Sequence, residues 1–314
     1  MSPRLVRNDV VLDDGHRVGV ASCGAGLPLV LIHGLTGEGI LYAQTLSRVV
    51  RMGFRVVAVD MAGHGATPGL PRGGGHLASY SLLLGRVLDH LGVQRAVLAG
   101  HSMGGRIVAQ LAANEPERAV AVLLIDACVG ESWDWLMRVS RVAPPLLSGL
   151  GLMSLADSLT TVPMLRDRRQ ARKLGRLAAP TMAAHLRRPW RLFGPIVSMV
   201  RSGPSRALLD ELASHKTPLV AVHGDRDLVV PYRTAQDAVK VTGGWLVTVH
   251  GGTHSWLLKD PETLPAILEE LLAGPVWAGV RQHTSRAATR PSTDGRHPAA
   301  TPRYRWTITP ADQL

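Results

Sequence analysis

The 314-residue sequence predicts an α/β fold, in which helices cover both faces of a mostly parallel β-sheet. Two observations support this prediction. Short continuous apolar runs recur along the chain, and segments with helical spacing of apolar residues separate them. Strands that are buried on both faces consist of such continuous apolar runs, so the pattern favours parallel strands. Polar residues directly follow the runs, at the edge of the sheet where ligands bind in such folds.

The first expected element is a hairpin over residues 10–20, because Asp14-Gly15 is a strong turn signal between β-branched residues. Six apolar runs follow and are predicted to be strands, at residues 29–32, 55–59, 96–99, 121–125, 218–222 and 245–249. Helical patterns are found at residues 40–51, 76–91, 104–114, 232–241 and 261–273. The polar residues expected at the carboxyl ends of the strands are His33, Asp60, Ser102, Asp126, Asp227 and His254.

The stretch from residue 129 to 216 interrupts this alternation. It contains no convincing strand, is rich in Leu, Arg, Met and Pro, and has the pattern of several short helices. We therefore predict a core made of residues 1–128 and 217–274, with residues 129–216 inserted as a helical cap. The tail, residues 275–314, is rich in Arg, Thr, Pro and Ala with little periodicity, which predicts a basic, disordered segment.

Composition excludes several classes of protein. The chain is 46% hydrophobic and 19% charged, as expected of a globular protein. The start of the chain lacks the apolar core of a signal peptide, and no run approaches the ~20 apolar residues of a membrane span. The chain has only two cysteines, which does not suggest a disulfide framework. We therefore expect a cytoplasmic protein. The histidines lack the spacing of metal ligands, and neither a metal nor a cofactor is expected.

The net charge of +11 is concentrated in two segments. Residues 131–216 contain 14 Lys and Arg against 6 Asp and Glu, and the tail contains 6 Arg against 2 Asp. No nucleic-acid-binding module accompanies this charge, so nucleic acid is not an expected partner. The cap combines apolar residues, between Leu146 and Leu155, with arginines, between Arg166 and Arg191. This mixture suits a substrate with an acyl chain and peripheral contact with an anionic membrane, although a solvated helix face would show the same composition.

The strongest chemical signal is Gly100-His101-Ser102-Met103-Gly104-Gly105, which follows a predicted strand and precedes a predicted helix. A G-x-S-x-G pattern in this context forms a sharp turn that exposes the serine hydroxyl. The glycines leave room for that turn, and the helix N-terminus favours developing negative charge. We therefore predict that Ser102 is a nucleophile.

A serine hydroxyl needs a base, and the base needs a carboxylate that fixes its tautomer. His254 lies on a glycine-containing loop after the last predicted strand and is the predicted base. Asp227 follows the preceding strand and is the predicted acid, which gives the chain order Ser, Asp, His. Asp225 and Asp126 are alternatives for this third role. The oxyanion would be held by the peptide N–H groups of Met103 and Leu35.

Together, these motifs resemble the α/β-hydrolase superfamily. The resemblance covers about residues 10–273 and also includes His33-Gly34, residues 60–65 and residues 224–227. It implies an eight-stranded, mostly parallel sheet with a helical cap inserted after the sixth strand. Within this superfamily, an aspartate nucleophile marks the dehalogenases and epoxide hydrolases, whereas this chain has Ser102. His64 is expected to orient the loop beside the site.

The resemblance implies a serine hydrolase that cleaves a small-molecule carboxylic ester through an acyl-enzyme. A carbon–carbon bond hydrolase or a perhydrolase on the same scaffold is the alternative within the enzymes. Carbon–carbon hydrolases usually have Trp directly after the catalytic His, whereas here Ser255 precedes Trp256. A non-catalytic binding protein on this scaffold is the alternative from another class.

Overall fold

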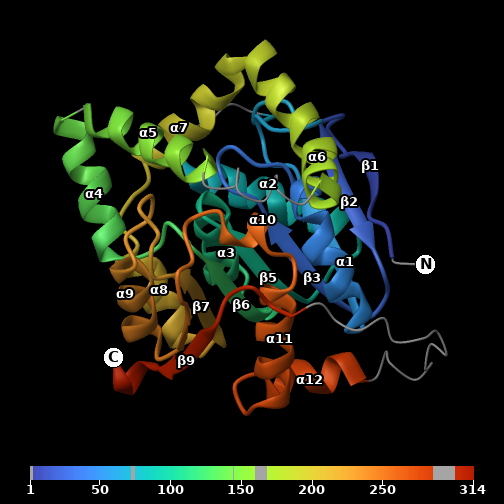
Figure 1. The fold of residues 1–314 in the computed structure, drawn as a ribbon, viewed down its shortest axis with the longest axis vertical. Helices are drawn as coiled ribbons and strands as arrows, with labels where there is room; N and C mark the ends of the chain where they lie inside the picture. The colour runs from blue at the N-terminus through green and yellow to red at the C-terminus, as the bar shows by residue number, and fades with distance from the viewer. Residues whose placement is uncertain (1–2, 72–74, 144, 160–167, 286–300) are drawn as a thin grey trace.

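The computed structural model describes residues 3–71, 75–143, 145–159, 168–285 and 301–314. Its centre is one nine-stranded sheet with the order β1-β2-β4-β3-β5-β6-β7-β8-β9, flanked by helices on both faces (Figure 1). The strands from β3 to β8 are parallel to one another, whereas β1, β2 and β9 pair antiparallel with their neighbours. The predicted α/β class is therefore confirmed.

The hairpin at the start of the chain forms as predicted. β1 (Val6–Val11) pairs with β2 (Arg17–Cys23), and the turn between them contains Gly15 with a φ of 78°. β2 then lies antiparallel to β4 (Phe54–Val59), so the hairpin forms one edge of the sheet.

The parallel strands are almost entirely buried. They are β3 (Leu27–Ile32), β4, β5 (Ala96–His101), β6 (Ala119–Ile125), β7 (Leu219–Gly224) and β8 (Trp245–Val249). Successive side chains of a strand point to opposite faces, so Val30 and Ile32 join one core cluster while Leu29 and Leu31 join the other. Both faces thus have their own apolar layer, which is why the strands show continuous apolar runs.

Each face of the sheet is covered by its own helices. The core cluster on one face includes residues of the helices α2 (Leu77–His90), α3 (Met103–Asn114) and α9 (Arg233–Thr242). The other includes α1 (Ala43–Arg51), the short α10 (Trp256–Lys259) and α11 (Thr263–Ala273). This arrangement leaves the carboxyl ends of the strands as the place where the loops gather.

The insertion between β6 and β7 is helical, as predicted, and its described residues contain no strand. It consists of α4 (Glu131–Val142), α5 (Pro145–Leu159), α6 (Arg168–Arg187), the 3-10 turn η4 (Pro189–Leu192), α7 (Phe193–Val200) and α8 (Arg206–Ser214). α8 packs against α3 and α9 and buries Leu208, Leu209 and Leu212 in the core. The division into core and cap at residues 129 and 216 stays a prediction, and α8 is the helix of this insertion that joins the core layer.

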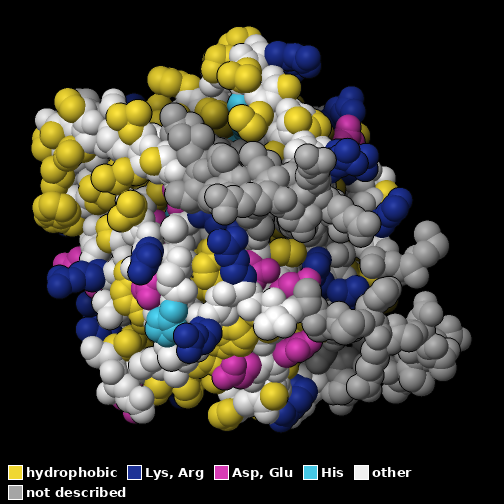
Figure 2. Space-filling view, viewed as in Figure 1, with side chains coloured by type: hydrophobic (Ala, Val, Ile, Leu, Met, Phe, Trp, Pro, Cys, Tyr) yellow, Lys and Arg dark blue, Asp and Glu magenta, His cyan; other side chains and the backbone are white. Residues whose placement is uncertain are grey.

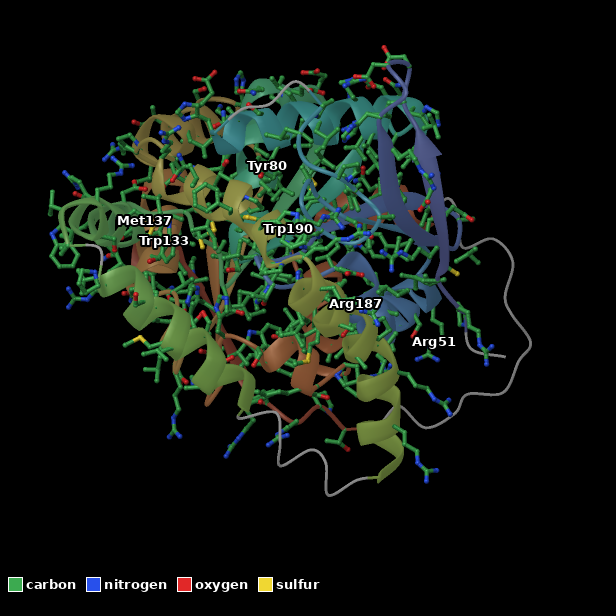
Figure 3. The ribbon with its side chains drawn as sticks, turned by 90° about the horizontal axis from the view of Figure 1, so that it is seen from above. Arg51, Tyr80, Trp133, Met137, Arg187 and Trp190 are labelled. Carbon is green, nitrogen blue, oxygen red and sulfur yellow. The ribbon has the colours of Figure 1, made fainter. Side chains whose placement is uncertain are left out.

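α4 anchors the start of the insertion beside the strand ends. Its Trp133 and Met137 are buried in a small cluster with Cys128, Val229 and Val230 (Figure 3). The last two residues belong to the loop that carries Asp227, so the first cap helix supports that loop.

The prediction of a disordered tail is wrong for the described part of it. α12 (Ala278–Ser285) packs against α11, and β9 (Trp306–Pro310) pairs antiparallel with β8, which makes nine strands rather than eight. Residues 286–300 lie outside the described residues. The end of the tail is ordered because β8 would otherwise be an open edge of the sheet. β9 provides hydrogen-bond partners for the backbone groups along that edge. Ile308 also packs against the core, and the Trp306 ring N–H donates to Glu270 at 2.7 Å.

Within the described residues, no helix combines the length and apolar character that crossing a membrane requires. Cys23 and Cys128 are both free thiols.

Candidate active site

Ser102 occupies the sharp turn between β5 and α3. Its φ is 55° and its ψ is −121°, a conformation that L-residues rarely adopt. A Cβ added at Gly104 would overlap the carbonyl oxygen of Ile32 on the neighbouring strand. The turn therefore requires a glycine here for close packing, and the strain at Ser102 is held by the surrounding sheet.

Gly104→Ala is expected to destabilise the protein by about 3 kcal/mol or more, because the added methyl group meets backbone that cannot move aside. Urea unfolding of the variant beside the wild type measures this change. Gly149→Ala is the matched control, since Gly149 lies in α5 with nothing within 4 Å of the added Cβ. An equal loss of stability in both variants would contradict the close packing at Gly104.

Ser102 is 6% exposed, and its Oγ lies 3.8 Å from the Cys128 thiol. Burial raises the pKa of Cys128 to about 12, so the thiol stays protonated near neutral pH. The sequence had not singled out Cys128, because a lone cysteine after a strand carries no signal. No hydrogen bond joins Ser102 Oγ to the His254 ring among the described residues. Such bonds often tighten only when substrate binds, and the Oγ can rotate between staggered positions.

His254 and Asp227 are brought together by the loops after β8 and β7. The His254 Nδ1–H donates to Asp227 Oδ2 at 2.7 Å. Asp227 Oδ1 accepts the backbone N–H groups of Val229 and Val230 at 2.8 and 2.9 Å. These contacts hold the carboxylate and assign the proton of the neutral imidazole to Nδ1, which leaves Nε2 as the acceptor that a base needs.

The electrostatics of this pair follow from its burial and its contact. Burial would raise the pKa of Asp227, but His254 and His223, which both face the carboxylate, together outweigh burial and hold the pKa well below its usual value. Burial would likewise lower the pKa of His254, whereas Asp227 raises it above the ordinary histidine value. Asp227 is therefore ionised at neutral pH, and it stabilises the protonated form of His254.

The two alternative carboxylates are held elsewhere. Asp225 accepts from His250 Nδ1 at 3.2 Å and from the Gly251 N–H at 2.7 Å. Asp126 is fully buried and accepts the Gly224 N–H and the Trp256 ring N–H at 2.9 and 2.6 Å. Burial raises the pKa of Asp126 to about 7. Of the three candidates, Asp227 is the one hydrogen-bonded to His254.

One cluster of side chains has the spacing of a metal site. Its atoms that could bind a metal ion lie within 4.8 Å of one another and belong to Asp126, His223 and Asp227. These side chains already form hydrogen bonds with other groups of the protein, however. The His223 Nε2–H donates to the Val230 carbonyl at 3.0 Å, and both carboxylates accept the bonds described above. We assign this cluster to positioning of the Asp227 loop.

The loop after β3 carries Leu35, the predicted oxyanion donor. The Met61 N–H donates to His33 Nε2 at 3.0 Å, which assigns the ring proton to Nδ1, and that N–H donates to the Gly34 carbonyl at 2.7 Å. The Gly34 carbonyl and the Leu35 N–H belong to one planar peptide, so this bond also orients the Leu35 N–H. Burial lowers the pKa of His33, which keeps the ring neutral as this arrangement requires.

His64 holds the other side of the same loop. Its Nε2–H donates to the Leu35 carbonyl at 2.5 Å, consistent with the loop-orienting role expected for it. Met103, the second predicted donor, is the first residue of α3, where a backbone N–H has no partner within the helix. Whether these two N–H groups hold an oxyanion stays a prediction.

Two residues beside the site carried no sequence signal for a role there. The Tyr42 hydroxyl donates to His101 Nδ1 at 3.0 Å, and the His101 Nε2–H donates to the His254 carbonyl at 3.0 Å. Burial lowers the pKa of His101 to about 3, so the ring is neutral and has one N–H. The residue before Ser102 thus holds the main chain of His254, with the two imidazole rings 4.9 Å apart. Tyr42 and His101 are 59 positions apart in the chain, which explains why the sequence alone did not connect them.

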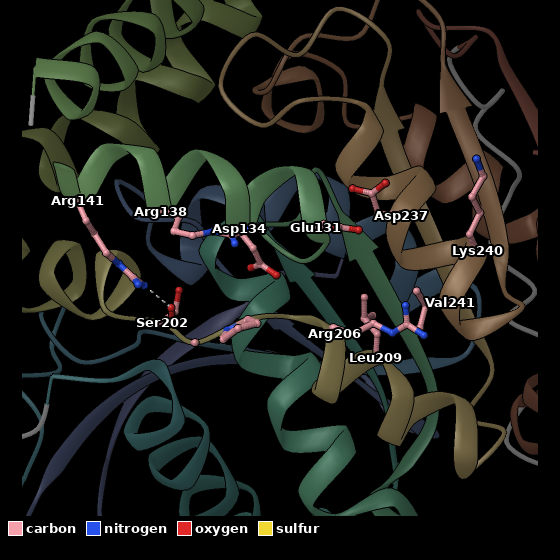
Figure 4. A pocket seen from close by; sticks show the side chains of 12 residues that line it. Glu131, Asp134, Arg138, Arg141, Ser202, Arg206, Leu209, Asp237, Lys240 and Val241 are labelled. Carbon is pink, nitrogen blue, oxygen red and sulfur yellow. Dashed lines mark hydrogen bonds between the residues drawn. The ribbon is translucent and has the colours of Figure 1, made fainter. Parts of the chain in front are cut away.

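A surface hollow of about 420 Å³ lies away from these residues, between α4, α8 and α9 (Figure 4). Its charged side chains are largely engaged with the protein. Arg141 donates to the carbonyls of Val200 and Ser202, and Arg206 to Asp210. The hollow contains none of the predicted site residues, and we assign no substrate to it.

Comparisons with known proteins agree with this fold. The family described as alpha/beta hydrolase fold matches residues 28–260. A protein of Mycobacterium phage D29 named "Putative non-heme haloperoxidase" is 33% identical over 272 residues, which cover 81% of this chain and 90% of that protein. An esterase from Rhodococcus sp. ECU1013 is 20% identical with a TM-score of 0.65 and covers 87% of this chain and 99% of its own. A thermophilic esterase from Thermogutta terrifontis is also 20% identical, with a TM-score of 0.63 and coverages of 85% and 98%. The chain therefore belongs to the α/β-hydrolase family and is an enzyme of the hydrolase class.

Proposed function

We propose that the protein is a serine hydrolase that cleaves carboxylic esters of small molecules through an acyl-enzyme. The observation that supports this most directly is the 2.7 Å hydrogen bond between Asp227 and His254, beside the strained turn that carries Ser102. The arrangement provides a nucleophile, a base and a carboxylate in the order expected for this fold.

In the first half of the proposed reaction, Ser102 Oγ attacks the acyl carbon while His254 Nε2 removes its proton. The negative charge that develops on the carbonyl oxygen is held by the N–H groups of Met103 and Leu35. Asp227 stabilises the imidazolium, which then donates the proton to the departing alkoxide. The products of this half are the alcohol and an ester of Ser102.

In the second half, water attacks the Ser102 ester. His254 removes a proton from that water and returns it to Ser102 Oγ, which releases the carboxylic acid. The Tyr42–His101 pair contributes by holding the His254 main chain, so the imidazole stays oriented through both halves. Pre-organisation of this kind lowers the barrier because little reorientation is needed during the reaction.

The experiment that tests the proposal measures hydrolysis of p-nitrophenyl esters with acyl chains from acetate to palmitate. We expect turnover that varies with chain length and an adduct with a fluorophosphonate probe on the peptide containing Ser102, found by mass spectrometry. His254→Ala should lose both turnover and labelling, because the serine then lacks its base. Folded protein that neither hydrolyses any ester nor reacts with the probe would contradict the proposal.

A second candidate function is perhydrolysis, which the similarity to the relative named as a haloperoxidase favours. Hydrogen peroxide would replace water in the second half, so the Ser102 ester would yield a peracid instead of the acid. Ser102-dependent oxidation of bromide in the presence of hydrogen peroxide and a carboxylic acid would support it. Ester hydrolysis that hydrogen peroxide does not divert would exclude it.

A further inference from the structure

The outer side of the cap exposes a set of large apolar side chains. Leu186 is 81% exposed, Phe193 71%, Trp190 68% and Met182 62%. Figure 2 shows hydrophobic side chains gathered along the upper part of the molecule, where Figure 1 places the helices α4 to α7. Side chains of this size are costly to leave in water, and a group of them usually marks a binding surface.

The stretch that carries these four side chains, residues 168–209, is basic and contains no acidic residue. Arg187 and Arg188 lie between Leu186 and Trp190 in the sequence, and both are exposed. In Figure 3, which views the molecule from above, Arg187 and Trp190 are labelled on neighbouring segments. From residue 168 to residue 209 the sequence has 10 Lys and Arg and no Asp or Glu. We call Met182, Leu186, Arg187, Arg188, Trp190 and Phe193 the cap face.

The segment that carries the cap face is attached directly to loops of the candidate site. The His185 Nε2–H donates to the Thr36 carbonyl at 3.3 Å, next to the predicted oxyanion donor Leu35. Arg191 donates to the Gly65 carbonyl at 3.1 Å and to the Thr67 carbonyl. A surface that binds the cap face is therefore held against the same side of the molecule as Ser102.

We propose that the cap face binds the surface of an anionic lipid membrane and presents the site to lipophilic esters located there. Exposed aromatic and aliphatic side chains interleaved with arginines are the composition of surfaces that insert into the headgroup region. The arginines would meet the negative potential of anionic lipids. The substrate part of this inference rests on the proposed ester hydrolysis, whereas the binding part does not.

Charge favours a lipid surface over a second copy of the chain as the occupant. A two-fold dimer places the same patch of each copy against the other. Two cap faces would then bring arginines together without a single carboxylate from this stretch to compensate them. An anionic membrane offers the opposite charge and an apolar layer beneath it.

The binding part is tested by co-sedimentation of the full chain with vesicles of phosphatidylcholine alone and of phosphatidylcholine mixed with phosphatidylglycerol. We expect binding to the mixed vesicles that is at least about 10-fold tighter and is lost at high salt. The double variant Arg187→Glu/Arg188→Glu and the double variant Trp190→Ser/Phe193→Ser should each weaken it by about 10-fold or more. Their circular dichroism spectra and unfolding midpoints check that they fold.

Two variants outside the cap face serve as controls. Arg95→Glu changes an exposed charge at the amino end of β5, opposite the site, and Val6→Ser changes an exposed apolar residue on the edge strand β1. Both should bind the mixed vesicles like the wild type. Binding that is equal for both lipid compositions, or that is weakened equally by control and cap-face variants, would overturn the proposal. A dimer in light scattering that the cap-face variants convert to a monomer would also overturn it and assign the face to a second copy.

The substrate part uses a different readout. Cap-face variants should hydrolyse dissolved p-nitrophenyl acetate like the wild type, but should lose about 10-fold or more in rate on long-chain esters dispersed in anionic vesicles. Equal rates on the dispersed esters would overturn this part. Ser102→Ala should still bind vesicles, so a protein that binds lipid without cleaving any ester would refute the proposed function and leave the lipid-binding surface standing.

Discussion

Replacement of Ser102 by alanine is expected to lower kcat for ester hydrolysis by about 10⁴- to 10⁶-fold, with the protein still folded. The reason is that Ser102 Oγ is the atom proposed to form the acyl-enzyme, and the members of a triad act as a unit. The alanine methyl group fits the space of the serine, so the unfolding midpoint should change little. Initial rates on the preferred p-nitrophenyl ester, with chemical denaturation beside them, measure both quantities.

Cys128→Ala is the informative control for that experiment, because the Cys128 thiol lies 3.8 Å from Ser102 Oγ. The raised pKa of Cys128 keeps it protonated, and a thiol in this form is a poor nucleophile. We therefore expect Cys128→Ala to retain activity within about 10-fold of the wild type. If activity survived in Ser102→Ala but disappeared in Cys128→Ala, the cysteine would be the nucleophile.

Asp227→Asn is expected to reduce kcat/KM by about 10³- to 10⁴-fold and to move its pH dependence. The base must be neutral, so kcat/KM of the wild type falls as the pH decreases through the pKa of His254. Asp227 raises that pKa, and its removal lowers it, so the acid limb of the residual activity should move to lower pH. Rates measured between about pH 5 and 9, a range that brackets the ordinary histidine pKa, on wild type and variant give both the size of the loss and the direction in which the acid limb moves.

Asp225→Asn provides the matched comparison, since it makes the same change two residues away on the same loop. Asp225 contacts His250 and the Gly251 N–H rather than His254. Its variant should therefore keep wild-type kcat/KM within a few-fold and an unmoved acid limb. A larger loss for Asp225→Asn than for Asp227→Asn would transfer the acid role to Asp225.

Much of the fold could be predicted because the signals are local. A strand that is buried on both faces must be apolar throughout, so β3 to β8 are visible as runs of Val, Leu and Ile. The turn at Ser102 is equally local, since glycine is needed where the helix meets the neighbouring strand. The tail was misjudged for the opposite reason. β9 is stabilised by the edge of β8, and the sequence of residues 306–310 does not reveal that partner.

By itself, the sequence determined the alternation of strands and helices, the helical insertion, and the order in which Ser102, Asp227 and His254 follow their strands. These features depend on periodicity and on the chemistry of single positions, which the chain carries locally. The tertiary structure alone decided which carboxylate contacts His254, because Asp126, Asp225 and Asp227 all follow buried strands and the sequence does not show where the loops place them. It also decided that Tyr42, His101 and Cys128 surround the site, since contacts between distant segments arise only when the sheet brings the strand ends to one edge.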